Sequence, residues 1–200
     1  MVAAVSTQSC THATMQKPKL HVPPPRSAAV TTFASASTSY HSLSIVFDTK
    51  GIDSASVSQG HKNFLKNLVL PRLASWSGSF LQVNGPTQMG PIKGDPCELG
   101  YAPDSKFTDS SFTGDLLVIA MAVSDASVNF VAQASACTLS ATDYRPTVGF
   151  IKFNAYYLPL NESQFDRHVR VSMHELTHIL VFSPALYQYF RGYASPSDVT

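Results

Sequence analysis

The sequence predicts one domain with a mixed sheet, of α/β or α+β class, because segments with strand patterns alternate with segments of helical periodicity. Two hundred residues are enough for one domain with a substantial core, and no internal repeat is evident. Hydrophobic residues make up 44% of the chain and charged residues only 14%. A core can therefore form, while most of the polar surface must come from uncharged side chains.

Regular structure is expected from about residue 41 onward. Residues 1–40 are rich in Ser, Thr, Ala and Pro, which predicts a flexible leader or a tail resembling a pro-segment. A strand is predicted at Ser42–Phe47, and a helix at His61–Ser77 that Pro71 must kink or divide. A second, short strand is predicted at Phe80–Val83.

The second half of the chain contains the more informative segments. Asp115–Ala122 is continuously apolar after its first residue and predicts a strand buried on both faces. Val148–Asn154 alternates, which favours a half-exposed edge strand. A long helix is predicted at Gln164–Phe182, with Ser163 as its N-cap and Pro184 as its stop signal.

This last helix contains His174-Glu175-Leu176-Thr177-His178, an HExxH motif. Two histidines four positions apart lie one helical turn from each other, so both imidazoles can reach one Zn²⁺. Glu175 lies beside the pair, where it can take the proton of a zinc-activated water. The composition gives about 0.004 chance matches to this pattern, so the motif is specific.

A catalytic zinc site needs a third protein ligand, and the sequence offers no obvious one. After His178 there is no His, Glu or Cys, and the only acidic residue is Asp198. His168 lies about 120° around the helix from His174 and is expected to be a surface or groove residue. We therefore expect the third ligand beyond Thr200, in which case the chain is an incomplete fragment.

Charge and apolar runs exclude other classes of function. The formal net charge is +1, which does not favour a nucleic-acid partner. No apolar run approaches the roughly 18 residues of a membrane span, and no signal peptide is visible in the first twenty residues. Association with a membrane is therefore expected only through segments that this chain lacks.

Val171–Ser183 resembles the active-site helix of the leishmanolysin family of zinc metalloproteases, which carries HExxHxxGFS. The similarity spans about residues 40–190 and includes Leu68–Arg72, Gly94–Cys97 and Val148–Asn154. It implies an α+β, metzincin-like N-terminal subdomain, in which a backing helix and the active-site helix pack on a twisted mixed sheet. It also implies that an edge strand, which we assign to Gly149–Asn154, pairs with extended substrate.

The resemblance further implies a Cys97–Cys137 disulfide and an extracellular or cell-surface location. Two departures from the family pattern stand out. The family's glycine after HExxHxx is Val181 here, so either the turn differs or the helix continues. Cys10 lies in a partial match to the family's HxCxHD pro-segment motif, which leaves two readings: a cysteine switch that blocks the zinc, or an incidental cysteine of the tail.

The leading hypothesis is a zinc-dependent endopeptidase that acts on proteins or peptides, with His174 and His178 as ligands and Glu175 as general base. The alternative is a catalytically inactive binding or adhesion module that keeps the same fold. The absent third ligand and Val181 favour the alternative, whereas the intact Glu175 favours the enzyme. A third hypothesis is a truncated product that does not fold stably.

Overall fold

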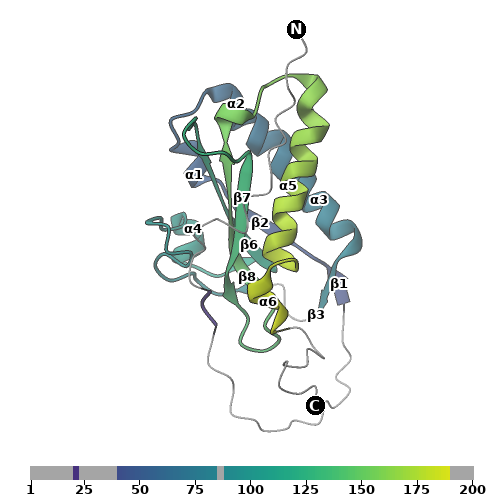
Figure 1. Cartoon of the computed structure of the whole chain (residues 1–200). Helices are drawn as coiled ribbons and strands as arrows, with labels where there is room; N and C mark the ends of the chain where they lie inside the picture. The colour runs from purple at the N-terminus through teal and green to yellow at the C-terminus, as the bar shows by residue number, and fades with distance from the viewer. Residues whose placement is uncertain (1–19, 23–39, 85–87, 190–200) are drawn as a thin grey trace.

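The computed structural model describes residues 20–22, 40–84 and 88–189, and Figure 1 shows the arrangement of their helices and strands. The main sheet has four strands in the order β2-β6-β8-β7. Their bounds are Ile45–Asp48 (β2), Leu116–Val123 (β6), Ala132–Leu139 (β7) and Pro146–Asn154 (β8). β2 and β8 run parallel to β6, whereas β7 runs antiparallel to β8. The α+β class and the mixed sheet are thus confirmed.

Two further pairs of short strands lie outside this sheet. One joins β1 (Tyr40–Ser42) to β3 (Gln82–Asn84), and the other joins β4 (Gln88–Met89) to β5 (Phe112–Thr113). The bounds of the strands predicted at 42–47 and 80–83 therefore differ from those in the structure. The first is two separate strands, β1 and β2, and Phe80 is the last residue of a helix.

The helix predicted at His61–Ser77 is present and longer than expected, and we call it the backing helix. It consists of α2 (Gln59–Phe64), a π-helical stretch (Leu65–Val69) and α3 (Leu70–Phe80). Pro71 does not divide it, because it lies in the first turn of α3 directly after the wider π-helical stretch. The remaining short helices are α1 (Lys50–Asp53), α4 (Ser105–Thr108), two 3₁₀ turns (Ala155–Tyr157 and Glu162–Gln164) and α6 (Pro184–Tyr187).

The HExxH motif lies on α5 (Phe165–Leu180), whose bounds differ from the prediction at both ends. Ser163 is not the N-cap. It belongs to the 3₁₀ turn that precedes the helix, and its hydroxyl donates to the Asn161 side chain. The helix ends at Leu180, and Val181 follows with a φ of −146°. The turn therefore differs from one made by a glycine at positive φ, and Pro184 begins α6 instead of ending α5.

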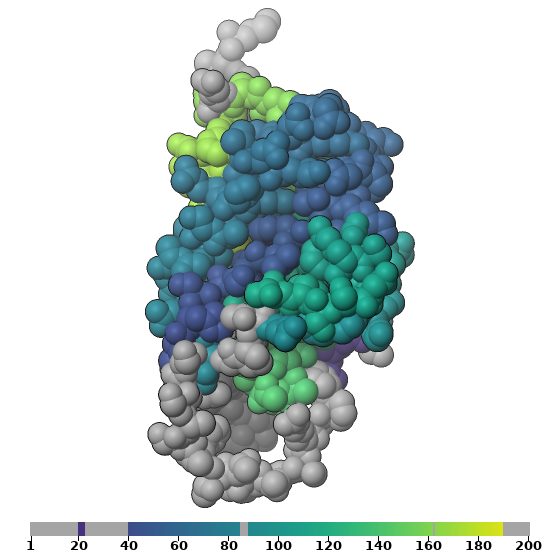
Figure 2. Space-filling model, turned by 180° about the vertical axis from the view of Figure 1, so that it is seen from behind, coloured from purple at the N-terminus to yellow at the C-terminus, as the bar shows by residue number. Residues whose placement is uncertain are grey.

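The two faces of the sheet are covered by different segments. One face contributes Val118, Ala120, Ile151 and Phe153 to a core shared with the backing helix and with Leu176 of α5. The opposite face is covered by the segment that follows β4, and its core includes Ile119, Val148 and Phe150. Figure 2 shows this segment, in teal, as a patch on the back of the molecule beside the blue helical segment.

The prediction of Val148–Asn154 as an edge strand is wrong. This segment is β8, which lies between β6 and β7, and six of its nine residues are buried. The edge on this side of the sheet is formed by β7, which was not among the predicted strands, and β2 forms the other edge. β7 has a bulge near Cys137, where its register against β8 shifts. β7 is therefore the strand that both contacts α5 and lies at an edge of the main sheet.

Gly149 on β8 allows α5 to approach the sheet closely. A Cβ atom at this position would lie 2.5 Å from Cγ2 of Ile179 and 3.0 Å from the carbonyl oxygen of Ser135. Real Cβ contacts are not this short, so a side chain here must push α5 away from β8. The glycine thus fixes the position of the helix that presents the HExxH motif.

We expect Gly149→Ala to lower the free energy of unfolding by about 1–3 kcal/mol, because the added methyl group overpacks this contact. Urea denaturation followed by circular dichroism measures the loss. Gly90→Ala is the matched control, since nothing lies within 4 Å of a Cβ at that position. In the double variant Gly149→Ala/Ile179→Ala, the loss of unfolding free energy should be smaller than the sum of the losses in the two single variants. Equal stability of Gly149→Ala and the wild type would contradict this account.

Candidate metal centre

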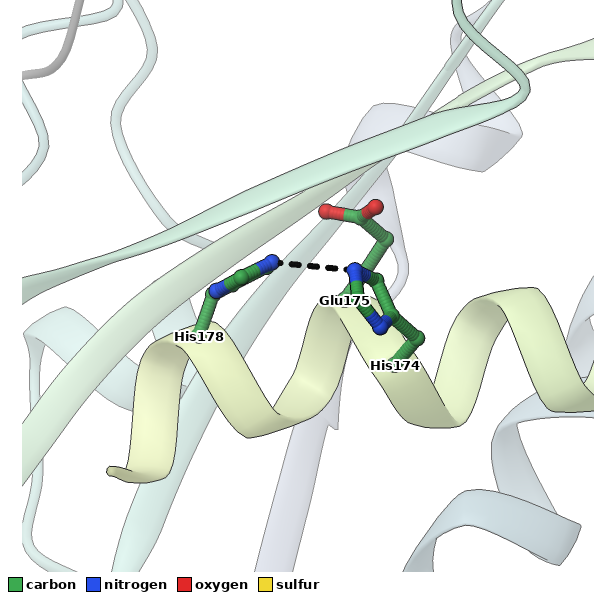
Figure 3. A group of neighbouring side chains, drawn as sticks. All are labelled: His174, Glu175 and His178. Atoms are coloured by element: carbon green, nitrogen blue, oxygen red, sulfur yellow. Dashed lines mark hydrogen bonds between the residues drawn. The ribbon is translucent and has the colours of Figure 1, made fainter. Parts of the chain in front are cut away.

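The structure brings His174, Glu175 and His178 together on α5 (Figure 3). Their potential ligand atoms lie within 4.8 Å of one another. His178 and Glu175 are buried, at 9% and 5% exposure, whereas His174 is exposed. Among the residues that the structure describes, this is the only group of three or more His, Cys, Asp or Glu side chains with metal-binding geometry.

The two imidazoles face each other through their Nε2 atoms, which are 3.2 Å apart. Two nitrogens bound to one tetrahedral Zn²⁺ at 2.0–2.1 Å would be about 3.3 Å apart. The spacing of the pair therefore fits a shared zinc ion without rearrangement of the helix.

The turn after α5 orients the ring of His178. Its Nδ1 lies 2.6 Å from the carbonyl oxygen of Phe182. Because a carbonyl only accepts, Nδ1 carries the proton and donates it, which leaves the lone pair of a neutral ring on Nε2. A second hydrogen bond of this kind is what orients a metal-ligating histidine. The chain turn at Val181 and Phe182 thus orients the ring of His178 with its Nε2 toward His174, although no glycine is present there.

The electrostatics of the group reflect its burial. Desolvation lowers the pKa of His174, and the neighbouring His178 lowers it further. Desolvation also raises the pKa of Glu175 to about 7, although a hydrogen bond from the backbone of Ala134 acts in the opposite direction. Neutral imidazoles are the form that binds a metal.

Ala134 belongs to β7, so the carboxylate of Glu175 lies between the active-site helix and the edge strand. A peptide that pairs with β7 would therefore pass next to this carboxylate. Sequence reasoning missed this contact because it missed β7. The segment Ala132–Leu139 consists mostly of small or polar residues, so any alternation of apolar and polar side chains along it gives only a weak strand signal.

The remaining histidines of the described residues are bonded elsewhere. His21 and His41 are within ion-pair distance of Glu98 and Asp115. The Nε2 atoms of His61 and His168 lie 2.9 and 3.3 Å from the carbonyl oxygens of Leu158 and Pro159. His168 points away from the candidate metal centre as expected, but it is only 3% exposed, so its prediction as a surface or groove residue is wrong. Phe64 and Phe165 lie close to each other, and Phe64 packs edge-on against His168.

The structure contains the disulfide between Cys97 and Cys137. Both cysteines are fully buried in the core on the side of the sheet opposite α5. Cys10 and Asp198 lie outside the described residues, so the two readings of Cys10 stay predictions. In the part of the chain that the structure describes, no helix has both the length and the hydrophobicity needed to cross a bilayer.

Comparison with known proteins agrees with the geometry of this site. Residues 57–199, which include the backing helix, the whole sheet except β2, and α5, match the sequence model of the leishmanolysin family. The chain belongs to the leishmanolysin family. No curated protein matches the sequence. The leishmanolysin family is a family of zinc-dependent metalloproteases, and the HExxH group of this member lies where a zinc ion fits.

Proposed function

We propose that this leishmanolysin-family chain is a zinc-dependent endopeptidase whose metal is held by His174 and His178. The observation that carries the proposal is the pair of Nε2 atoms 3.2 Å apart, with a buried carboxylate beside them. A zinc site needs at least one further protein ligand. In this proposal the third ligand comes from outside the described residues, either from this chain or from a longer form of it.

The side chains of α5 divide the chemistry between them. When bound, Zn²⁺ supplies a Lewis acid that makes water more acidic and polarises a peptide carbonyl. Glu175 accepts the proton of the attacking water and returns it to the amide nitrogen as the carbon–nitrogen bond breaks. Its contact with Ala134 keeps the carboxylate next to the edge strand, along which the substrate is expected to lie.

The proposed substrate is an extended segment of a protein or peptide. Main-chain donors and acceptors along the edge of β7 would give affinity without strict sequence preference. The buried disulfide supports a location in an oxidising compartment, so we propose that the protein acts outside the cytosol, in the extracellular space or at the cell surface.

A catalytically inactive binding module is the second candidate. It is favoured by one observation, namely that the described residues hold two histidine ligands and no third. None of the observations above supports a role in adhesion.

Zinc-dependent cleavage of a quenched fluorescent peptide library tests the proposal. We expect one Zn²⁺ per chain by elemental analysis, cleavage that a chelator abolishes, and recovery of cleavage when Zn²⁺ is added back. His178→Ala should lose the bound zinc, whereas His61→Ala, which removes a histidine bonded to Leu158, should keep it. Bound zinc without any cleavage would favour the binding module, and absence of zinc from the folded chain would refute the proposed zinc-dependent endopeptidase.

A further inference from the structure

A short N-terminal segment lies along the edge of β7 that faces away from β8. Leu20–Val22, purple in Figure 1, forms a parallel bridge to β7 through His21 and Thr138. The backbone N–H of His21 donates to the carbonyl of Cys137 at 2.8 Å, and the N–H of Leu139 donates to the carbonyl of His21 at 3.2 Å. These two bonds are those of an extended peptide added to a sheet edge.

The side chains of this segment alternate between two environments. Leu20 and Val22 pack against the core that the sheet shares with α5. The intervening His21 lies on the other side, with its Nε2 atom 3.4 Å from Oε1 of Glu98. This is the alternation expected of a strand. The two apolar side chains face the apolar core, and the basic side chain between them faces the carboxylate of Glu98.

The disulfide fixes the two parts of this site relative to each other. Glu98 follows Cys97, and Cys97 is bonded to Cys137, whose carbonyl accepts the hydrogen bond from His21. The carboxylate is therefore held beside the edge of β7. We call the main chain of Cys137–Leu139 together with Glu98 the β7 docking site.

The docking site continues the edge that leads to the candidate metal centre. Ala134, whose backbone contacts Glu175, precedes Thr138 by four residues on the same strand. Because of the bulge near Cys137, this stretch of β7 lies opposite only three residue steps of β8, from Ile151 to Val148, which span about 10 Å. A peptide that lies along β7 with its reacting bond near Glu175 thus reaches the docking site about three residues from that bond, where Leu20–Val22 already lies.

We propose that the β7 docking site is a peptide subsite selective for an apolar–basic–apolar sequence, and that Leu20–Val22 is its intramolecular occupant. Glu98 is the specificity-determining residue, because its carboxylate favours a cationic or histidine side chain at the middle position. An incoming peptide of this pattern must displace Leu20–Val22. The effect on cleavage rests on the proposed function, whereas the docking itself requires neither zinc nor catalysis.

The test uses the full chain carrying Glu175→Gln, so that no bound peptide is cleaved. The probe is a fluorescein-labelled peptide with the sequence of residues 17–25, KPKLHVPPP. We expect Leu20→Asp/Val22→Asp to bind this probe at least tenfold more tightly than the parent chain, because its own segment no longer competes. His21→Pro, which removes both the N–H that donates to Cys137 and the ring that pairs with Glu98, should act in the same direction. Leu68→Asp, at an exposed leucine on the backing helix, is the matched control.

Hydrogen exchange reports on the same site without a probe. The amide of Leu139 should exchange faster in Leu20→Asp/Val22→Asp than in the parent chain, and added peptide should restore its protection. When Glu98→Lys is added to Leu20→Asp/Val22→Asp, binding of the probe should weaken. A second probe, in which Glu replaces the histidine of KPKLHVPPP, should then bind more tightly than the first. Equal probe affinity or equal Leu139 exchange in the parent chain and both segment variants would overturn the proposal. If the probe docks as expected but the chain with Glu175 intact cleaves no peptide, the docking proposal stands and only the proposed function is refuted.

Discussion

Glu175→Gln is expected to reduce peptide cleavage by about 10²–10⁴-fold, the range that a positioned general base contributes. The amide has nearly the shape of the carboxylate, so it fills the same buried position and its oxygen can still accept from Ala134. It cannot accept the proton of an attacking water. The loss should therefore appear in kcat, while the affinity for peptide stays close to that of the wild type.

Zinc content separates this effect from damage to the site. Because Glu175 is not one of the two proposed ligands, Glu175→Gln should retain one Zn²⁺ per chain, unlike His178→Ala. Asp166→Asn is the matched control, since it neutralises an exposed carboxylate in the first turn of the same helix. Full activity of Glu175→Gln would exclude this residue as the base, and loss of zinc from the variant would assign Glu175 to the metal instead.

The active-site helix could be predicted because its signals are local. The spacing of His174 and His178 fixes their relative position once the segment is helical, whatever surrounds it. The same geometry indicated that His168 points elsewhere. It could not show that His168 is buried, because Phe64, which packs against its ring, comes from a helix about a hundred residues earlier in the sequence.

The order of the strands could not be predicted in the same way. β8 was expected at an edge because its alternation suggested one exposed face. Its second neighbour, β7, is made largely of Ala, Ser, Cys and Thr. This composition gives a weak strand signal, so the sequence did not predict a strand that pairs with the outer side of β8. β7 is the strand that contacts both Glu175 and Leu20–Val22, so the least predictable strand lies next to the site.

The two ends of α5 could not be predicted, because they depend on contacts that the sequence pattern does not show. Ser163 and Asp166 have the spacing of a capping box, yet the chain makes a 3₁₀ turn over Ser163 and starts α5 at Phe165. At the other end, the family glycine is replaced by Val181, and the chain still turns, with a negative φ. The carbonyl of Phe182 then accepts from His178, so the altered turn contributes directly to the site.

Removal of the disulfide should have the largest effect on stability. The bond joins residues 40 positions apart, and the chain entropy of a closed loop of that length corresponds to about 4 kcal/mol. We expect the double variant Cys97→Ala/Cys137→Ala to lose about this much free energy of unfolding in urea denaturation. For a domain of this size the loss is a large share of the total, so the variant should be partly unfolded near body temperature.

The loss should be concentrated on the face of the sheet opposite α5. Cys97 anchors the segment that covers Ile119, Val148 and Phe150, and it carries Glu98 next to the edge of β7. Hydrogen exchange should therefore increase first in residues 88–104 and at His21, before it increases in α5. Wild-type protein in a strong reductant is the internal control and should match the double variant. If the variant were as stable as the oxidised wild type, close packing around the two sulfur positions, and not the covalent link, would hold this segment on the sheet.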